Sequence, residues 1–245
     1  FEKIADEKTV TYSSAAWVWR KLYLEANVNY DRTFGDHRLG GLLFYYIEDT
    51  SETGADKSMN AIPKRYQSLS GRFTYGFKDT YFWDLNFGLN GSENFEPGKQ
   101  YGFFPAGAFA WVPSSYEFIR ENVSWLNFKL RVSYGVVGND RISSRRFPYL
   151  TLIKEENASN PWGGTGSLTE EQVGANNLMW EKAKKFDVGM DLHLFKDKFT
   201  LTLDYFKDTR DGIFQERKQI PDYVGLIQMP YGNIGRMKSW GADGN

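Results

Sequence analysis

The sequence contains no cysteine among its 245 residues, which excludes a disulfide framework and a cysteine-ligated zinc site. It contains two histidines, His37 and His193, and neither sits in a cluster of residues with metal-ligand spacing. The formal net charge of -1 gives no electrostatic reason to expect a nucleic-acid partner. No apolar run reaches about 18 residues, so we expect no transmembrane helix.

Catalytic motifs are missing as well. The sequence has no GxSxG, no phosphate-binding loop and no HExxH. Two acidic pairs, Glu155-Glu156 and Glu170-Glu171, lie in a long polar stretch, where a solvated surface explains them better than a calcium or acid–base site. We therefore expect neither an enzyme nor a bound metal or cofactor.

Aromatic residues are abundant: 15 Tyr, 19 Phe and 8 Trp. Aromatic side chains favour β-strands, and rings of aromatic residues mark both interfaces of membrane β-barrels. This composition fits a β-rich chain that contacts a membrane.

Apolar and polar residues alternate with a period of two. Between Leu22 and Asp31, the apolar set 22, 24, 26, 28 and 30 alternates with a polar set that includes Glu25, Asn27 and Asn29. This pattern predicts a strand with one face away from water. Similar segments predict further strands at 38–48 (apolar on both faces), 68–77, 81–90, 103–111, 128–136, 186–194 and 199–206, and one that begins near Met237.

The predicted connections alternate between short and long. Tight turns are expected at 34–37, 77–80 and 195–198, and long polar loops at 49–65, 91–102, 138–177 and 209–235. The exception is the long connection 112–125, where a helical turn is expected around Tyr116 to Arg120. Alternation alone also fits a soluble β-sandwich, but short turns at one end and long loops at the other are typical of outer-membrane barrels.

Three stretches carry a resemblance to a known family. They are Gly91–Phe95 followed by Gly102–Ala106 and Trp111; LNFKLRVSYGVVGN at 126–139; and Asn177–Glu181 followed by Phe186–Asp191 and 201–211. In this order and spacing they resemble the barrel of SusC/RagA-type TonB-dependent transporters of the Bacteroidetes, from about Leu22 to the C-terminus.

The resemblance implies a 22-stranded barrel that encloses a plug domain, a segment that engages TonB, and a SusD-like lipoprotein as an outer lid. We expect residues 1–245 to be a partial barrel domain, an all-β, antiparallel transmembrane segment of about 8–10 strands, with the plug and the terminal strands absent. The implied function is import of a polar oligomeric nutrient across the bacterial outer membrane, with a glycan favoured and a peptide as the alternative cargo. Two alternatives remain at this point: a soluble or surface-attached all-β carbohydrate-binding protein, and a small structural outer-membrane barrel that closes by itself.

Two groups of residues are candidates for contact with the plug, the cargo or the lid. Polar residues predicted to face the lumen could bind the plug or a ligand, although wall hydration also accounts for them: Glu25, Asn27, Asn29, Arg72, Asp84, Asn86, Lys129, Arg131, Asp187 and Asp191. Aromatic residues in the predicted loops could stack on sugar or contact the lid, although loop packing also accounts for them: Phe95, Tyr101, Phe147, Tyr149, Trp162 and Trp180. The loop 138–177 is the strongest candidate for lid contact because it is the longest.

Overall fold

The computed structural model describes residues 18–53, 59, 62–123, 125–141, 146–159, 165–195, 198–221, 224–225 and 228–245. Within these ranges it contains eleven strands and two short helical turns. The strands are β1 (Val18–Phe34), β2 (His37–Thr53), β3 (Lys64–Phe77), β4 (Tyr81–Ser92), β5 (Tyr101–Trp111), β6 (Leu126–Asn139), β7 (Leu152–Ser159), β8 (Thr165–Gln172), β9 (Glu181–Leu194), β10 (Phe199–Glu216) and β11 (Tyr231–Gly244).

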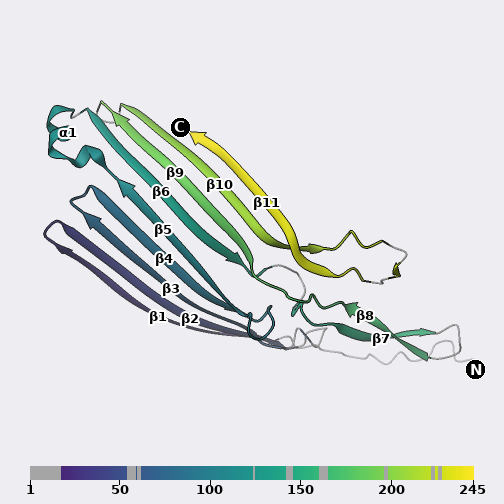
Figure 1. Cartoon of the computed structure of the whole chain (residues 1–245). Helices are drawn as coiled ribbons and strands as arrows, with labels where there is room; N and C mark the ends of the chain where they lie inside the picture. Colours follow the sequence, from purple (N-terminus) through teal and green to yellow (C-terminus); the bar gives the residue numbers. More distant parts are fainter. Residues whose placement is uncertain are drawn as a thin grey trace, which may run out of the picture.

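Nine of the strands form one antiparallel sheet in the order β1-β2-β3-β4-β5-β6-β9-β10-β11, and β7 and β8 form a separate hairpin. Short connections join β1 to β2, β3 to β4 and β9 to β10 at one end of the sheet (Figure 1, upper left). The other long connections lie at the opposite end, which we call the loop end, whereas the long connection between β5 and β6 lies beside the short turns. Within the described ranges, β1 and β11 each have a strand neighbour on one side only.

The short turns have a backbone that suits hairpins. Gly35 has a φ of 56°, and Lys78 and Asp79 have φ values of 52° and 49°. Positive φ at the turn matches the right-handed twist of the flanking strands. The Lys78 amide also donates to the Asp36 carbonyl at 2.9 Å, so neighbouring turns are bonded to each other.

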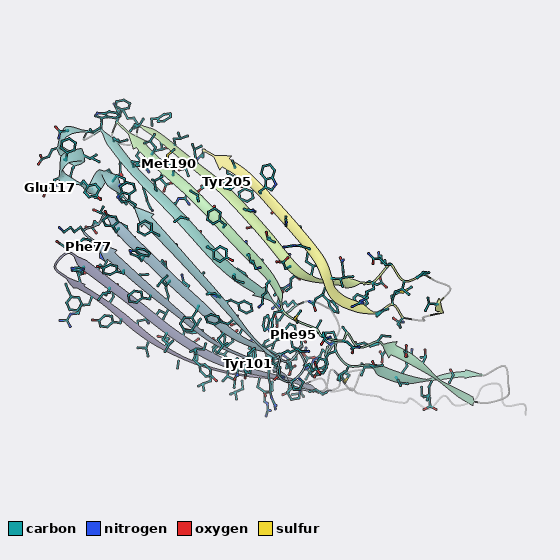
Figure 2. The ribbon with its side chains drawn as sticks, viewed as in Figure 1. Phe77, Phe95, Tyr101, Glu117, Met190 and Tyr205 are labelled. Carbon is teal, nitrogen blue, oxygen red and sulfur yellow. The ribbon has the colours of Figure 1, made fainter. Side chains whose placement is uncertain are left out.

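The sheet has one apolar and one polar face because antiparallel partners in register point to the same side. One row on the apolar face runs from β3 to β10, and the adjacent row on the polar face runs beside it. The apolar row is Tyr75, Trp83, Phe109, Val132, Val188 and Tyr205, and the polar-face row is Thr74, Asp84, Ala108, Ser133, Asp187 and Phe206. Figure 2 shows the side chains that project from both faces of the sheet.

All the strands predicted from the sequence are present, and several extend further than predicted. β10 continues to Glu216 and β11 begins at Tyr231, so the 209–235 loop was predicted too long. These extensions carry charged side chains, such as the ion pair from Arg236 Nε to Asp211 Oδ1 at 2.7 Å. These extensions pair without an apolar face, so the alternation of apolar and polar residues did not predict them.

The 138–177 connection was predicted as a loop without strands, and this was wrong. It contains the hairpin of β7 and β8, whose residues alternate poorly because the hairpin stands apart from the main sheet (Figure 1). The helical turn expected at 116–120 is α1 (Glu117–Asn122), preceded by a single 3-10 turn at Pro113–Ser115. No helix in the described ranges is long and apolar enough to cross a membrane.

A matched pair of substitutions tests which face meets lipid. Leu203 lies on the apolar face of β10 and is 42% exposed, and Thr202 lies beside it on the polar face, opposite Asp191. We expect Leu203→Arg to destabilise the full-length protein in lipid vesicles by about 2–4 kcal/mol, because a cation on the lipid face must be desolvated. Thr202→Arg should change stability by less than about 0.5 kcal/mol, since its cation stays in a polar environment.

The measurement is equilibrium unfolding in denaturant of both variants in the same vesicles. Equal losses for the two variants, or a larger loss for Thr202→Arg, would contradict the assignment of the faces.

Candidate functional site

The polar face of the sheet borders a hollow of about 470 Å³ that spans β2 to β9. Both charge signs line it: Arg72, Lys129 and Arg131 stand among Asp84 and Asp187. The apolar face offers aliphatic and aromatic side chains instead, such as Val28 at 68% and Leu85 at 51% exposure. The polar face is therefore the wall of the interior.

The ten polar residues predicted to face the lumen all lie on this one face, according to the strand register. Arg72, Asp84, Lys129, Arg131 and Asp187 border the hollow itself. The other five lie on the same face along β1, β4 and β9: Glu25, Asn27, Asn29, Asn86 and Asp191. Contact of any of them with a plug or a ligand stays a prediction.

Some charges of the wall are paired across strands. Arg72 Nη2 lies 2.5 Å from Asp84 Oδ2. Arg131 on β6 reaches over β9 to Asp204 on β10, with Nη2 2.8 Å from Oδ1, and its Nε lies 3.3 Å from Asp191 Oδ2. The side chains of Arg131, Asp191 and Asp204 are 19–34% exposed, so removing one of these partners costs more than at an open surface.

Gly189 makes the reach of Arg131 possible. A Cβ at this position would lie 2.7 Å from both Arg131 Nε and Cζ, and it would also meet the Asp204 carboxylate. The guanidinium therefore passes over a glycine to link three strands on the wall.

Two charged groups that border the hollow have no partner in the part of the chain that the structure describes. Within the described ranges, neither Lys129 nor Asp187 makes an ion pair or a side-chain hydrogen bond, although both border the hollow. The wall thus combines charges that neutralise one another with charges that remain available to an occupant of the interior.

The loop end has a small core of its own. Phe95, Phe104, Leu178 and Trp180 are 0–8% exposed, and the rings of Phe95 and Trp180 stack with centroids 4.8 Å apart. The core sits where β5 and β6 separate, because their pairing stops at Ala106. The β4–β5 connection and the connection between β6 and β9 are thereby packed against each other and against β5.

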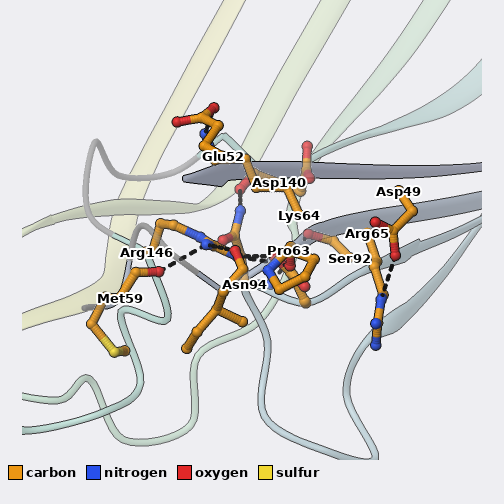
Figure 3. Close-up of polar contacts among 12 residues, drawn as sticks. Asp49, Glu52, Met59, Pro63, Lys64, Arg65, Ser92, Asn94, Asp140 and Arg146 are labelled. Carbon is orange, nitrogen blue, oxygen red and sulfur yellow. Dashed lines mark hydrogen bonds and ion pairs between the residues drawn. The ribbon is translucent and has the colours of Figure 1, made fainter. Parts of the chain in front are cut away.

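Arg146 ties these loops together (Figure 3). Its guanidinium donates to the carbonyls of Met59 at 2.8 Å and Pro63 at 3.3 Å, and it also bonds to the Ile62 carbonyl and the Glu93 carboxylate. The Arg146 side chain is only 13% exposed. One side chain of the 140–180 connection therefore fixes the two neighbouring connections, β2 to β3 and β4 to β5.

The loop aromatics predicted from the sequence have different environments. Phe95, Phe147 and Trp180 are buried, and Tyr149 packs against the core. Burial, with Glu93 and Glu96 nearby, raises the pKa of the Tyr149 phenol, which keeps it neutral. Tyr101 is exposed on the apolar face at the loop end, where its hydroxyl accepts a hydrogen bond from Gln67 (Figure 2). Trp162 lies outside the described residues, and ligand or lid contact of all six stays a prediction.

Sequence reasoning missed Arg146 and Phe104. A single arginine in a loop carries no local signal, since its partners are 53 to 87 residues away. Phe104 belongs to a predicted strand, and nothing in the alternation indicates that β5 and β6 diverge beside it. Within the described ranges, no group of three or more His, Asp or Glu side chains could hold a metal ion.

Comparison with known proteins gives one family over almost the whole chain. The family model "TonB dependent receptor-like, beta-barrel" matches residues 6–245. TonB-dependent receptor P3 of Formosa agariphila is 26% identical, covering 97% of this chain and 25% of that protein. TonB-dependent receptor SusC of Bacteroides thetaiotaomicron is 28% identical, covering 72% of this chain and 18% of that protein. The chain thus spans about a quarter or less of the length of these curated relatives.

Solved structures share the fold. The RagAB peptide transporter superposes on 93% of this chain, and on 27% of that chain, with a TM-score of 0.71 at 22% identity. The siderophore receptor PirA from Pseudomonas aeruginosa superposes with a TM-score of 0.56 at 13% identity, covering 93% of this chain and 39% of that chain. The expected fold class, an antiparallel β-barrel wall, is therefore confirmed, and the total of 22 strands stays a prediction.

Substituting Gly189 tests the ion pairs of the wall. Gly189→Ala places a methyl group between Arg131 and Asp204, so we expect a loss of about 1–3 kcal/mol from the displaced charges. Gly88→Ala on β4 is the matched control, because its Cβ would have only an ordinary contact of 3.7 Å with Asn90 Nδ2. Unfolding of the full-length protein in vesicles measures both. Indistinguishable stabilities would show that the pairs over Gly189 contribute nothing.

Substituting Arg146 tests the link between loops. Arg146→Gln leaves Glu93 without its cation and removes the guanidinium that binds the carbonyls of Met59, Ile62 and Pro63. Amide exchange at residues 59, 62 and 93–100 should therefore accelerate by about tenfold or more. Arg236→Gln is the control, because it breaks an exposed ion pair that should contribute at most about 1 kcal/mol. Hydrogen–deuterium exchange with mass spectrometry measures the exchange rates in the β2–β3 and β4–β5 connections. Unchanged exchange in the Arg146 variant would mean that the guanidinium does not hold them.

Proposed function

The chain belongs to the TonB-dependent receptor-like β-barrel family, and on this premise we propose that it forms part of the wall of an importer for a polar oligomeric nutrient. As a member of this family it is a bacterial outer-membrane protein of the SusC/RagA type, and its relatives are receptors and transporters, not enzymes. Family membership removes the alternative of a soluble carbohydrate-binding protein.

The observation that carries the proposal is the two-faced sheet. A barrel wall in lipid must hydrogen-bond all its backbone within the sheet and turn apolar side chains outward. The interior face can then be polar. Here it carries the charged residues Arg72, Asp84, Arg131 and Asp187. Such an interior suits a hydrophilic cargo that could not cross the bilayer itself.

The proposed transport cycle needs no covalent chemistry. The cargo is captured at the loop end, and force relayed through TonB displaces a plug that fills the barrel, which opens a path along the polar wall. Lys129 and Asp187, which have no partner within the described ranges, would form ion pairs with the plug. The ion pairs of Arg131 with Asp191 and Asp204 would stay intact when the plug moves, so the strands β6, β9 and β10 would remain linked. The plug and the TonB-engaging segment would come from other parts of the protein.

The proposed partner is a SusD-like lipoprotein that covers the loop end. The loops there are packed into a fixed rim by Arg146 and by the core around Phe95 and Trp180, and a fixed rim provides a preorganised docking surface. Similarity to SusC and to RagAB supports this partner.

The proposed cargo is a glycan. The structures of RagAB are those of a peptide transporter, but identity to them is only about one residue in five. Besides charges of both signs, the polar face carries the hydroxyls of Thr74, Ser133, Tyr46 and Tyr66, which could bond to a hydroxyl-rich oligomer.

Uptake by whole cells tests the function. A deletion strain that lacks the full-length gene should lose uptake of fluorescently labelled oligosaccharides too large for porins, and it should keep uptake of the monosaccharides. Loss of TonB in the parent strain should have the same effect. Continued oligosaccharide uptake in the deletion strain, or a loss confined to peptides, would contradict the proposed cargo.

A further inference from the structure

A second hollow lies on the polar face at the loop end, separate from the charged hollow described above. It encloses about 280 Å³ between the ends of β2, β3 and β4 and the residues that follow β6. The residues that border it include Tyr46, Glu48, Tyr66, Asn90, Asp140, Arg141 and Trp180. Only Trp180 was a candidate from the sequence.

Unused hydrogen-bonding groups converge on this hollow. Trp180 Nε1 is buried and donates to no acceptor in the part of the chain that the structure describes. Within the same part, the hydroxyls of Tyr46 and Tyr66 and the charged groups of Asp140 and Arg141 form no hydrogen bond or ion pair. A buried donor without an acceptor costs free energy, so Trp180 Nε1 lacks a partner that a ligand could supply. The other four side chains are half-buried or exposed, so their polar groups are open to a ligand that displaces water.

The groups are held in place without using their side-chain functions. The Asp140 backbone carbonyl accepts from Asn94 Nδ2 at 3.2 Å, and the Arg141 amide donates to Asn139 Oδ1 at 3.1 Å. Asn90 Oδ1 accepts from Ser68 Oγ at 2.6 Å, which orients the Asn90 amide and leaves its NH₂ group for another acceptor. The site is therefore preorganised, which reduces the entropy cost of binding.

The chemistry of the groups selects the ligand. Asp140 can accept only, Arg141 and Trp180 can donate only, and the two tyrosines can do both. A sugar hydroxyl both donates and accepts, so adjacent hydroxyls can satisfy this mixed set. Two carboxylates, Glu48 and Asp140, border the hollow together with one guanidinium, and Glu48 is already paired with Lys21 at 2.8 Å, so this lining disfavours a polyanion such as a phosphate ester. The half-buried rings of Tyr46 and Tyr66 offer flat apolar surfaces to the C–H face of a sugar ring.

We propose that this hollow is a subsite for one neutral sugar unit of an oligosaccharide cargo, with Asp140, Arg141 and Tyr66 as its polar contacts. This proposal rests on the proposed function, and it adds which residues would bind one sugar unit of the cargo. The site lies beside the rim formed by the packed loops, so cargo bound there would already be inside the lumen when the plug opens.

Calorimetry on the purified full-length receptor tests the subsite. The probes are tetra- to hexasaccharides of neutral hexoses and pentoses, together with tetra-alanine as a peptide probe. We expect at least one oligosaccharide to bind, Asp140→Asn to weaken it at least tenfold, and Tyr66→Phe to weaken it three- to tenfold, because each removes one contact. The matched controls are Asp36→Asn in the β1–β2 turn and Tyr205→Phe on the apolar face, which should bind like the parent.

Each outcome decides the matter. Weaker binding only in the Asp140 and Tyr66 variants supports the subsite. If a parent binds oligosaccharide and all variants bind equally well, the subsite is wrong while the importer stands. If the parent binds no oligosaccharide, or if the variants lose affinity for tetra-alanine instead, the sugar assignment is overturned. TonB-dependent uptake, measured separately in cells, distinguishes failure of the subsite from failure of the proposed function.

Discussion

Strand register is the constraint on which the whole structure depends. Each hydrogen-bonded neighbour passes the direction of its side chains to the next strand, so Trp83, Val132, Val188 and Tyr205 point the same way although they come from four strands. A shift by one residue in any strand would exchange its two faces. In lipid such a shift would bury charges in hydrocarbon. The short turns set the register of each hairpin, and the bilayer disfavours any other register.

The polar side of this register gives the protein its internal chemistry. Cross-strand pairs such as Arg131 with Asp204 neutralise part of the wall, while Lys129 and Asp187 keep their charges free within the described ranges. Towards the loop end the wall changes from paired charges to a hollow bordered by hydroxyls, amides, two carboxylates and one guanidinium. The loops above it are fixed by Arg146, so the rim and the wall act as one scaffold.

The sequence predicts most of the sheet because lipid imposes a strict period of two. The strand around Leu22 to Asp31 and the turn at Gly35 could be read directly, and the lumen side of Arg131 followed from its neighbours. Outside the bilayer that constraint ends. The hairpin of β7 and β8, the ends of β10 and β11, and the burial of Phe95 depend on contacts between residues far apart in the chain, which no local pattern records. Asp140 and Arg141 were missed for the same reason, because only folding brings them beside Tyr66.

The orientation of the sheet can be measured directly with a pair of adjacent spin labels. The chain has no cysteine, so a single cysteine at Val188 or at Asp187 can be labelled in this part of the full-length receptor, in lipid vesicles. The account predicts that the label at 188 collides often with oxygen, which concentrates in lipid, and rarely with a water-soluble nickel chelate. The label at 187 should show the reverse. Two labels with equal accessibility, or a label at 187 that favours oxygen, would contradict the account.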